Sequence, residues 1–252
     1  KPSSAASDVY KRQSLFHAMA GKPVLIENQL FSTLETTIGR MQKSPRILMV
    51  DTIGFVDNLP TVLLDSFNST IKESIISDLI LLIIDGNDEK NEFIRKLETT
   101  LRELEAQKDN FNFDKLQTVI TKCDLVTEQK LNELCEVIKK YDLSVPIKTS
   151  SVEKIGVLKL RNTILSRLFG KPISIDILPP TENNHESQSA IIANLYDLGH
   201  IIRETKIHTL DIIRITLWVD DALLNRYLSK INNQLIISEN TTEVSVWLMI
   251  KI

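Results

Sequence analysis

The chain has 252 residues, 42% hydrophobic and 25% charged, which is enough to bury one large core or a large and a small one. A formal net charge of -3 excludes a generally basic surface, so any nucleic-acid contact must be local. Cys123 and Cys135 form no C-x-x-C pair, which argues against a zinc site and favours a reducing compartment. No apolar run is long enough to span a bilayer, and we expect a cytoplasmic protein without membrane contact.

Strand-like and helix-like segments alternate between residues 46 and 168. Short apolar runs that end in a polar residue predict buried strands at Arg46–Asp51, Asp78–Asp85, Leu116–Thr121 and Val145–Thr149. Apolar residues at three- and four-residue spacing predict helices at Pro60–Ser77, Asn91–Ala106, Thr127–Tyr141 and Val152–Leu168. This alternation predicts an α/β fold with a doubly wound, mostly parallel sheet.

A second, smaller unit is expected after Gly170. The stretch Gly170–Pro172 interrupts the alternation, and the polar stretch Pro179–Ser189 interrupts it again. Beyond them the chain has β-branched, strand-like runs and helix-like segments at Ala190–Leu198 and Asp221–Ile231. We therefore expect a small α+β domain with antiparallel pairing over residues 171–252, following a larger domain over residues 14–170.

Polar motifs follow three of the predicted strands, at the edge where doubly wound sheets bind ligands. The first is Asp51-Thr52-Ile53-Gly54, which has the D-x-x-G form found in nucleoside triphosphatases. There the carboxylate reaches Mg²⁺ through water, and the glycine lets a backbone N–H approach the γ-phosphate. The same four residues are also a common capped turn, so this motif alone does not decide the function.

The other two motifs suit a guanine base. Thr121-Lys122-Cys123-Asp124 is close to N-K-x-D, in which the aspartate accepts hydrogen bonds from the N1–H and 2-amino groups of guanine, whereas adenine presents an acceptor at N1. Lys122 would lay its aliphatic stem along the base, and Thr121 offers only part of the bonding of the usual Asn. Thr149-Ser150-Ser151 stands where an S-A-x loop offers a backbone N–H to the base O6. A charged loop with a free cysteine is the structural alternative, but the order of all three motifs favours a guanine-nucleotide site.

The stretch from Asp51 to Asp85 resembles the G domain of the HflX family of ribosome-associated GTPases, in which D-T-[VI]-G-F, a following L-P and an s-D-L strand recur. Ser14–Gly21 and Leu30–Leu34 resemble that family's segments after the P-loop. The resemblance runs from Ser14 to Leu168. It implies a P-loop GTPase fold, bound GTP or GDP, Mg²⁺-dependent GTP hydrolysis, and the large ribosomal subunit, through rRNA and protein, as the partner in ribosome splitting, rescue or assembly. We expect a monomer that binds no DNA.

The resemblance also assigns roles to residues. Thr33 maps best to the switch I threonine, which joins the Mg²⁺ shell when GTP is bound, with Thr36 and Thr37 as rivals. Thr33 and Gly54 would then serve hydrolysis, and Thr33 and Asp51 would hold Mg²⁺. The residues expected to contact the nucleotide are Asp51, Thr52, Gly54, Thr121, Lys122, Asp124, Ser150 and Ser151. Phe55 stands where many GTPases use Gln to orient the attacking water, so we expect slow hydrolysis unless the ribosome completes the site.

The family's P-loop has no counterpart in this chain. Lys11, Arg12 and Gln13 stand where Gly, Lys and Ser or Thr belong, and Gln13 occupies the position of the hydroxyl that ligates Mg²⁺. We expect the chain as written to bind GTP poorly and to be inactive. The first strand of the sheet would be missing as well, which would leave strand edges unpaired.

Two explanations compete for this opening segment. Asp8–Gln13 reads like the mosaic end of a sequencing-library transposon, which would make residues 1–13 non-native or disordered and the native protein an active GTPase; we favour this explanation. The rival is a pseudo-GTPase that acts as a nucleotide-independent binding module. A third possibility is another translation-associated GTPase family.

Overall fold

The computed structural model describes residues 14–20, 37–51, 75–106, 112–180, 186–231 and 235–238. The chain divides into two compact units, the first formed by Lys1–Gln42 and Arg46–Leu168 and the second by Lys43–Pro45 and Phe169–Ile252. Within the described ranges, no helix is long and apolar enough to cross a membrane. The helix predicted at Pro60–Ser77 lies almost entirely outside these ranges, and the last of the strand-like runs, at 244–252, lies wholly outside them.

A parallel sheet forms the centre of the first unit. Its described strands are β3 (Ile80–Asp85), β4 (Leu116–Thr121) and β5 (Ile147–Lys148), in the order β3-β4-β5. β3 and β4 pair in parallel register, with Asp85 opposite Thr121. Every residue of β4 is buried, as expected of a strand covered on both faces. The predicted α/β fold with a parallel sheet is confirmed.

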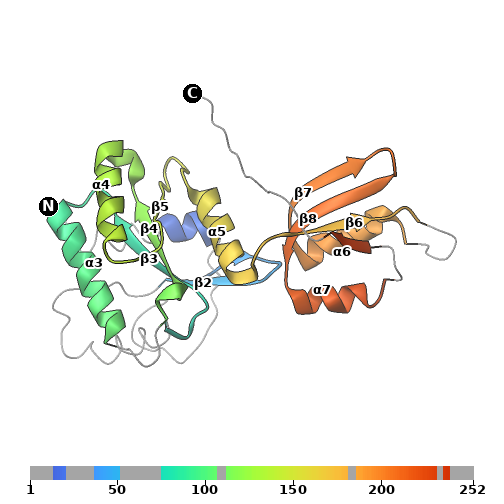
Figure 1. Cartoon of the computed structure of the whole chain (residues 1–252), viewed down its shortest axis with the longest axis horizontal. Helices are drawn as coiled ribbons and strands as arrows, with labels where there is room; N and C mark the ends of the chain where they lie inside the picture. The colour runs from blue at the N-terminus through green and yellow to red at the C-terminus, as the bar shows by residue number, and fades with distance from the viewer. Residues whose placement is uncertain are drawn as a thin grey trace. The chain divides into compact units, whose positions relative to one another are not determined.

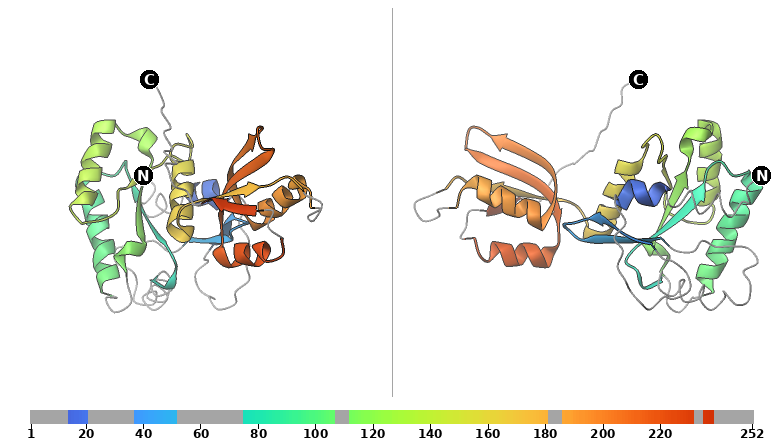
Figure 2. Two further views of the ribbon diagram at one scale, coloured as in Figure 1. Left: turned by 45° about the vertical axis from the view of Figure 1, so that its right-hand side comes forward. Right: turned by 180° about the vertical axis from the view of Figure 1, so that it is seen from behind.

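Helices cover both faces of this sheet. α3 (Lys90–Glu105) and α4 (Glu128–Lys139) share one core with β3 and β4. α3 contributes a stripe at helical spacing, and Thr127 caps α4 by accepting a hydrogen bond from the Lys130 N–H. α5 (Val157–Phe169) lies on the opposite side of the sheet from α3 and α4 (Figures 1 and 2).

A separate two-stranded sheet precedes the parallel one. β2 (Ile47–Asp51) pairs antiparallel with β1 (Thr37–Gln42), a strand that the sequence analysis does not predict. The strand predicted from the apolar run at β2 is confirmed, but its predicted burial is wrong, because Leu48 is 40% and Val50 is 53% exposed. In the described part of the chain β2 pairs only with β1, and β3 only with β4. A strand with a single neighbour leaves part of its apolar surface in solvent.

A short helix at Ser14–Ala20 packs against β1. At Gly39 a Cβ atom would lie 2.6 Å from the Cβ of Ala20, so only glycine permits this close approach. Arg161 of α5 donates to the Met19 carbonyl and to the side-chain oxygen of Gln42, both at 3.1 Å. One guanidinium therefore joins the helix, β1 and α5 within the first unit.

The second unit is an antiparallel sheet with helices packed on one face. Its described strands follow the order β7-β8-β6-β9, with bounds β6 (Ile173–Ile177), β7 (Gly199–Ile207), β8 (Ile212–Val219) and β9 (Leu235–Ser238). α6 (Gln188–Leu198) and α7 (Asp221–Leu228) lie against the sheet (Figure 2). They bury Ile191, Leu195 and Leu224 in a core shared with β6 and β8. The predicted α+β character and antiparallel pairing are confirmed, while β9 is an additional strand.

Candidate functional site

The carboxyl ends of β3, β4 and β5 meet at one edge of the parallel sheet, and backbone hydrogen bonds join the loops that follow them. The N–H of Gly86, just after β3, donates to the Thr121 carbonyl at 2.9 Å. The N–H of Cys123, just after β4, donates to the Thr149 carbonyl at 3.1 Å. The two predicted guanine motifs, 121–124 and 149–151, are therefore held side by side.

The loop at 121–124 turns its aspartate outward. Lys122 has φ +57° and ψ +37°, the left-handed conformation, and the next three residues form a short 3₁₀ turn. Thr121 donates its hydroxyl to the Ile84 carbonyl at 3.2 Å, so this side chain ties β4 to β3. The Asp124 side chain is exposed, and its carboxylate makes no hydrogen bond or ion pair with the described residues. It is therefore available to accept hydrogen bonds from a ligand.

A second carboxylate lies beneath this loop. The ammonium of Lys122 is 3.2 Å from a carboxylate oxygen of Asp85, whose side chain is only 6% exposed. The sequence analysis misses Asp85. The sequence did contain a signal for Asp85, because this residue ends a predicted strand. That strand lies next to the one that ends at Thr121, at the sheet edge where doubly wound folds bind ligands.

The loop after β5 is closed by its own hydrogen bonds. The buried Ser150 donates its N–H to the Ile155 carbonyl at 3.0 Å, and its hydroxyl oxygen accepts from the Glu153 N–H at 3.1 Å. No described residue accepts from the N–H of Ser151. Of the two serines predicted to contact the base, Ser151 is therefore the one with a backbone donor to offer.

The same loop corrects the predicted start of α5. The helix begins at Val157, so the prediction of Val152 is wrong by five residues. The hydrogen bond between Ser150 and Ile155 holds the intervening residues in a loop, and Gly156, with φ +69°, leads into the helix. A Cβ at Gly156 would overlap the Lys148 carbonyl oxygen.

The thiol inside the 121–124 loop is not activated. Burial raises the pKa of Cys123, and the nearby charge of Asp124 raises it further. Burial also raises the pKa of Cys135. Both side chains stay protonated at neutral pH, so they act as small packing residues rather than nucleophiles.

The expected Mg²⁺ and phosphate residues are mostly outside the described ranges. Gln13, Thr33, Thr52 and Gly54 all fall there. Asp51 is described: it is half-buried at the end of β2, opposite Thr37 in the β1–β2 ladder. The described residues contain no group of three or more His, Cys, Asp or Glu side chains that could hold a metal ion by themselves.

Comparison with known proteins finds similarity to GTPases. A family model described as a 50S ribosome-binding GTPase matches residues 13–122. The GTPase HflX of Methanocaldococcus jannaschii is 35% identical over 62% of this chain and 38% of its own length. The GTPases HflX of Thermococcus kodakarensis and Akkermansia muciniphila are 32% and 33% identical over 76% and 75% of this chain, and 44% and 42% of their own lengths. Over these segments the chain is similar to GTPases of the HflX family. It spans about two fifths of the length of these HflX relatives.

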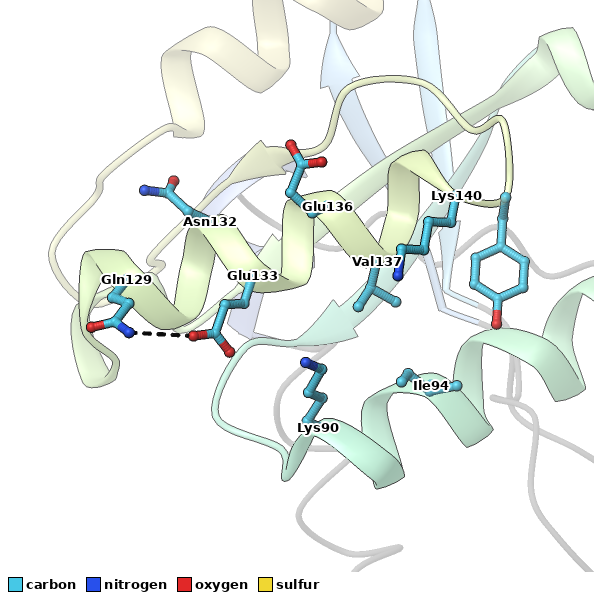
Figure 3. Close-up of a pocket in the computed structure, with 9 residues that line it drawn as sticks. Lys90, Ile94, Gln129, Asn132, Glu133, Glu136, Val137 and Lys140 are labelled. Atoms are coloured by element: carbon cyan, nitrogen blue, oxygen red, sulfur yellow. Dashed lines mark hydrogen bonds between the residues drawn. The ribbon is translucent and has the colours of Figure 1, made fainter.

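A groove elsewhere in the first unit is separate from the loops. It has a volume of about 830 Å³ and lies between α3 and α4 (Figure 3). Its lining comes from both helices and the turn after α4, and includes Ile94, Val137 and Tyr141. None of the motif residues contributes to it. The strand-end loops are the candidate nucleotide site, and this groove is not part of them.

The loop geometry predicts that replacing two different glycines with alanine lowers the stability of the protein by unequal amounts. Gly156 and Gly170 both have positive φ, but a Cβ at Gly170 would meet nothing within 4 Å. Gly170→Ala should cost about 1–2 kcal/mol, the price of the left-handed conformation alone. Gly156→Ala should cost at least about 1 kcal/mol more, because the overlap with Lys148 forces the loop apart. Urea unfolding measures both losses, and equal losses would contradict the packing described here.

Proposed function

We propose that this chain is the guanine-binding part of a GTP-binding protein that hydrolyses GTP in a Mg²⁺-dependent reaction coupled to the large ribosomal subunit, in ribosome splitting, rescue or assembly. The observation that supports this most is the hydrogen bond from Cys123 to Thr149, which joins the loop that carries the exposed Asp124 to the loop that carries Ser151. The similarity to HflX GTPases supports the same function. In this proposal the protein works in the cytoplasm, with GTP or GDP as its nucleotide.

Guanine recognition follows from the chemistry of the two loops. The Asp124 carboxylate would accept from N1–H and the 2-amino group, and the Ser151 N–H would donate to O6. The stem of Lys122 would cover one face of the base. Adenine would leave Asp124 facing an acceptor at N1, which accounts for a preference for GTP over ATP.

Hydrolysis would use the residues assigned by the family pattern. Asp51, through water, and Thr33 are oxygen donors of the kind that Mg²⁺ takes, and the bound phosphates would complete its shell. The ion would supply charge neutralisation at the phosphates. Gly54 would offer its N–H to the γ-phosphate, and Phe55 cannot orient water, so the ribosome would have to complete the site.

Base selectivity tests the role of Asp124. Asp124→Asn should weaken guanosine binding by about 10- to 100-fold, because a charge-assisted pair of hydrogen bonds is lost. The variant should favour xanthosine, since the amide can donate to the carbonyl that replaces the 2-amino group. Nucleoside titrations followed by amide chemical shifts measure both affinities. Asp114→Asn, another exposed carboxylate, is the control and should change neither. Unaltered selectivity in Asp124→Asn would favour a nucleotide-independent binding module.

The phosphates should contribute little to binding by this chain. With Lys11, Arg12 and Gln13 in place of the P-loop residues, we expect the dissociation constants of GTP and guanosine to differ by less than about tenfold, or 1.4 kcal/mol. Calorimetric titration with each ligand in the presence of Mg²⁺ measures the ratio. A GTP affinity about a thousandfold above that of guanosine would mean that the chain has a functional phosphate cradle.

A further inference from the structure

We propose that Asp85 is a positioning residue of the guanine site and acts by fixing Lys122. This inference rests on the proposed function, because it concerns the residue that would cover the base. The Lys122 ammonium lies 3.2 Å from Asp85, and the two side chains are 31% and 6% exposed respectively. The charged end of the lysine is thus anchored inside the protein, while part of its side chain stays open to solvent.

The position of the Asp85 carboxylate is itself fixed by the backbone. Its second oxygen accepts the N–H of Asn87 at 2.9 Å. The intervening Gly86 donates to the Thr121 carbonyl at 2.9 Å, and a Cβ at Gly86 would lie 2.9 Å from that same oxygen. The turn after β3 is therefore pressed against the start of the 121–124 loop. This packing holds the backbone that carries Asp85 close to the backbone that carries Lys122.

Anchoring the ammonium determines where the lysine stem lies. A free lysine side chain has many rotamers, and covering a base requires one narrow group of them. An ion pair formed before the ligand arrives removes this ordering cost from the binding step. The ion pair also stabilises the buried Asp85 carboxylate, because a charge that is largely shielded from water needs an opposite charge close to it. The lysine backbone, already in the left-handed conformation, directs the side chain back toward β3.

A neighbouring ion pair provides a control that distinguishes the positioning of Lys122 from a general contribution to stability. Asp88 lies three residues beyond Asp85 and pairs with Lys96 of α3 at 2.8 Å, with its side chain 14% exposed. Neither Asp88 nor Lys96 belongs to the 121–124 or 149–151 loops. Removing the Asp88 charge disrupts a partly buried pair on the same connection but leaves Lys122 untouched.

The test is a guanosine titration of the full chain, followed by amide chemical shifts, for the wild type, Asp85→Asn, Asp88→Asn, Lys122→Met and the double variant Asp85→Asn/Lys122→Met. Asp85→Asn should weaken guanosine binding about tenfold, and Asp88→Asn less than twofold. Because Asp85 acts through Lys122, adding Asp85→Asn to Lys122→Met should produce no further loss. An equal loss in both backgrounds would assign Asp85 a purely structural role and overturn the proposal.

The remaining outcomes are distinct. If the wild type binds guanosine and Asp85→Asn binds it equally well, the role of Asp85 is overturned and the proposed guanine site stands. If the wild type does not bind guanosine at all, the proposed site and the role of Asp85 are both overturned. If Asp85→Asn does not fold, Asp85→Glu replaces it, since that variant keeps the charge but displaces it by one methylene. Weaker guanosine binding by folded Asp85→Glu supports the proposal, and unchanged binding overturns it.

Discussion

The parallel register of β3, β4 and β5 is the constraint on which the candidate site depends. Because the strands run in one direction, the residues that end them, Asp85, Thr121 and Lys148, come to the same edge of the sheet. The hydrogen bond from Cys123 to Thr149 then fixes the separation of the two loops. Each loop can therefore present one polar feature to a ligand at a defined spacing, although the motifs are about 25 residues apart in sequence.

Two carboxylates at this edge of the sheet differ in environment and therefore in the role that we propose for each. Asp124 is exposed and makes no pair with the described residues, so it can exchange water for a ligand's donors at little cost. Asp85 is almost fully buried and is held by a lysine and a backbone N–H. A group that already has partners contributes by orienting other groups, while an unpartnered group contributes by direct contact. The division of roles follows from burial rather than from residue type.

Sequence patterns predicted the elements that are buried on both faces and missed those set by tertiary contacts. The run at 116–121 matches β4 residue for residue, because a short, fully buried strand leaves an unambiguous pattern. β1 has a mixed sequence and owes its strand form to its partner, whereas β9 is an apolar run of only four residues. The start of α5 was misplaced because a hydrogen bond between Ser150 and Ile155 outweighs local helix preference. Asp124, Lys122 and Ser151 could be selected from motif order, whereas Asp85 needed the register of the sheet.

The central claim is that the loops after β4 and β5 together bind a guanine base. The most direct measurement is a crystal structure of the chain with guanosine. Our account predicts the base between Asp124 and Ser151, with N1 and the 2-amino nitrogen at hydrogen-bonding distance, roughly 2.7–3.2 Å, from the carboxylate. The Lys122 stem should lie against one face of the ring. Guanosine bound in the α3–α4 groove, or bound at the loops with Asp124 turned away, would contradict the account.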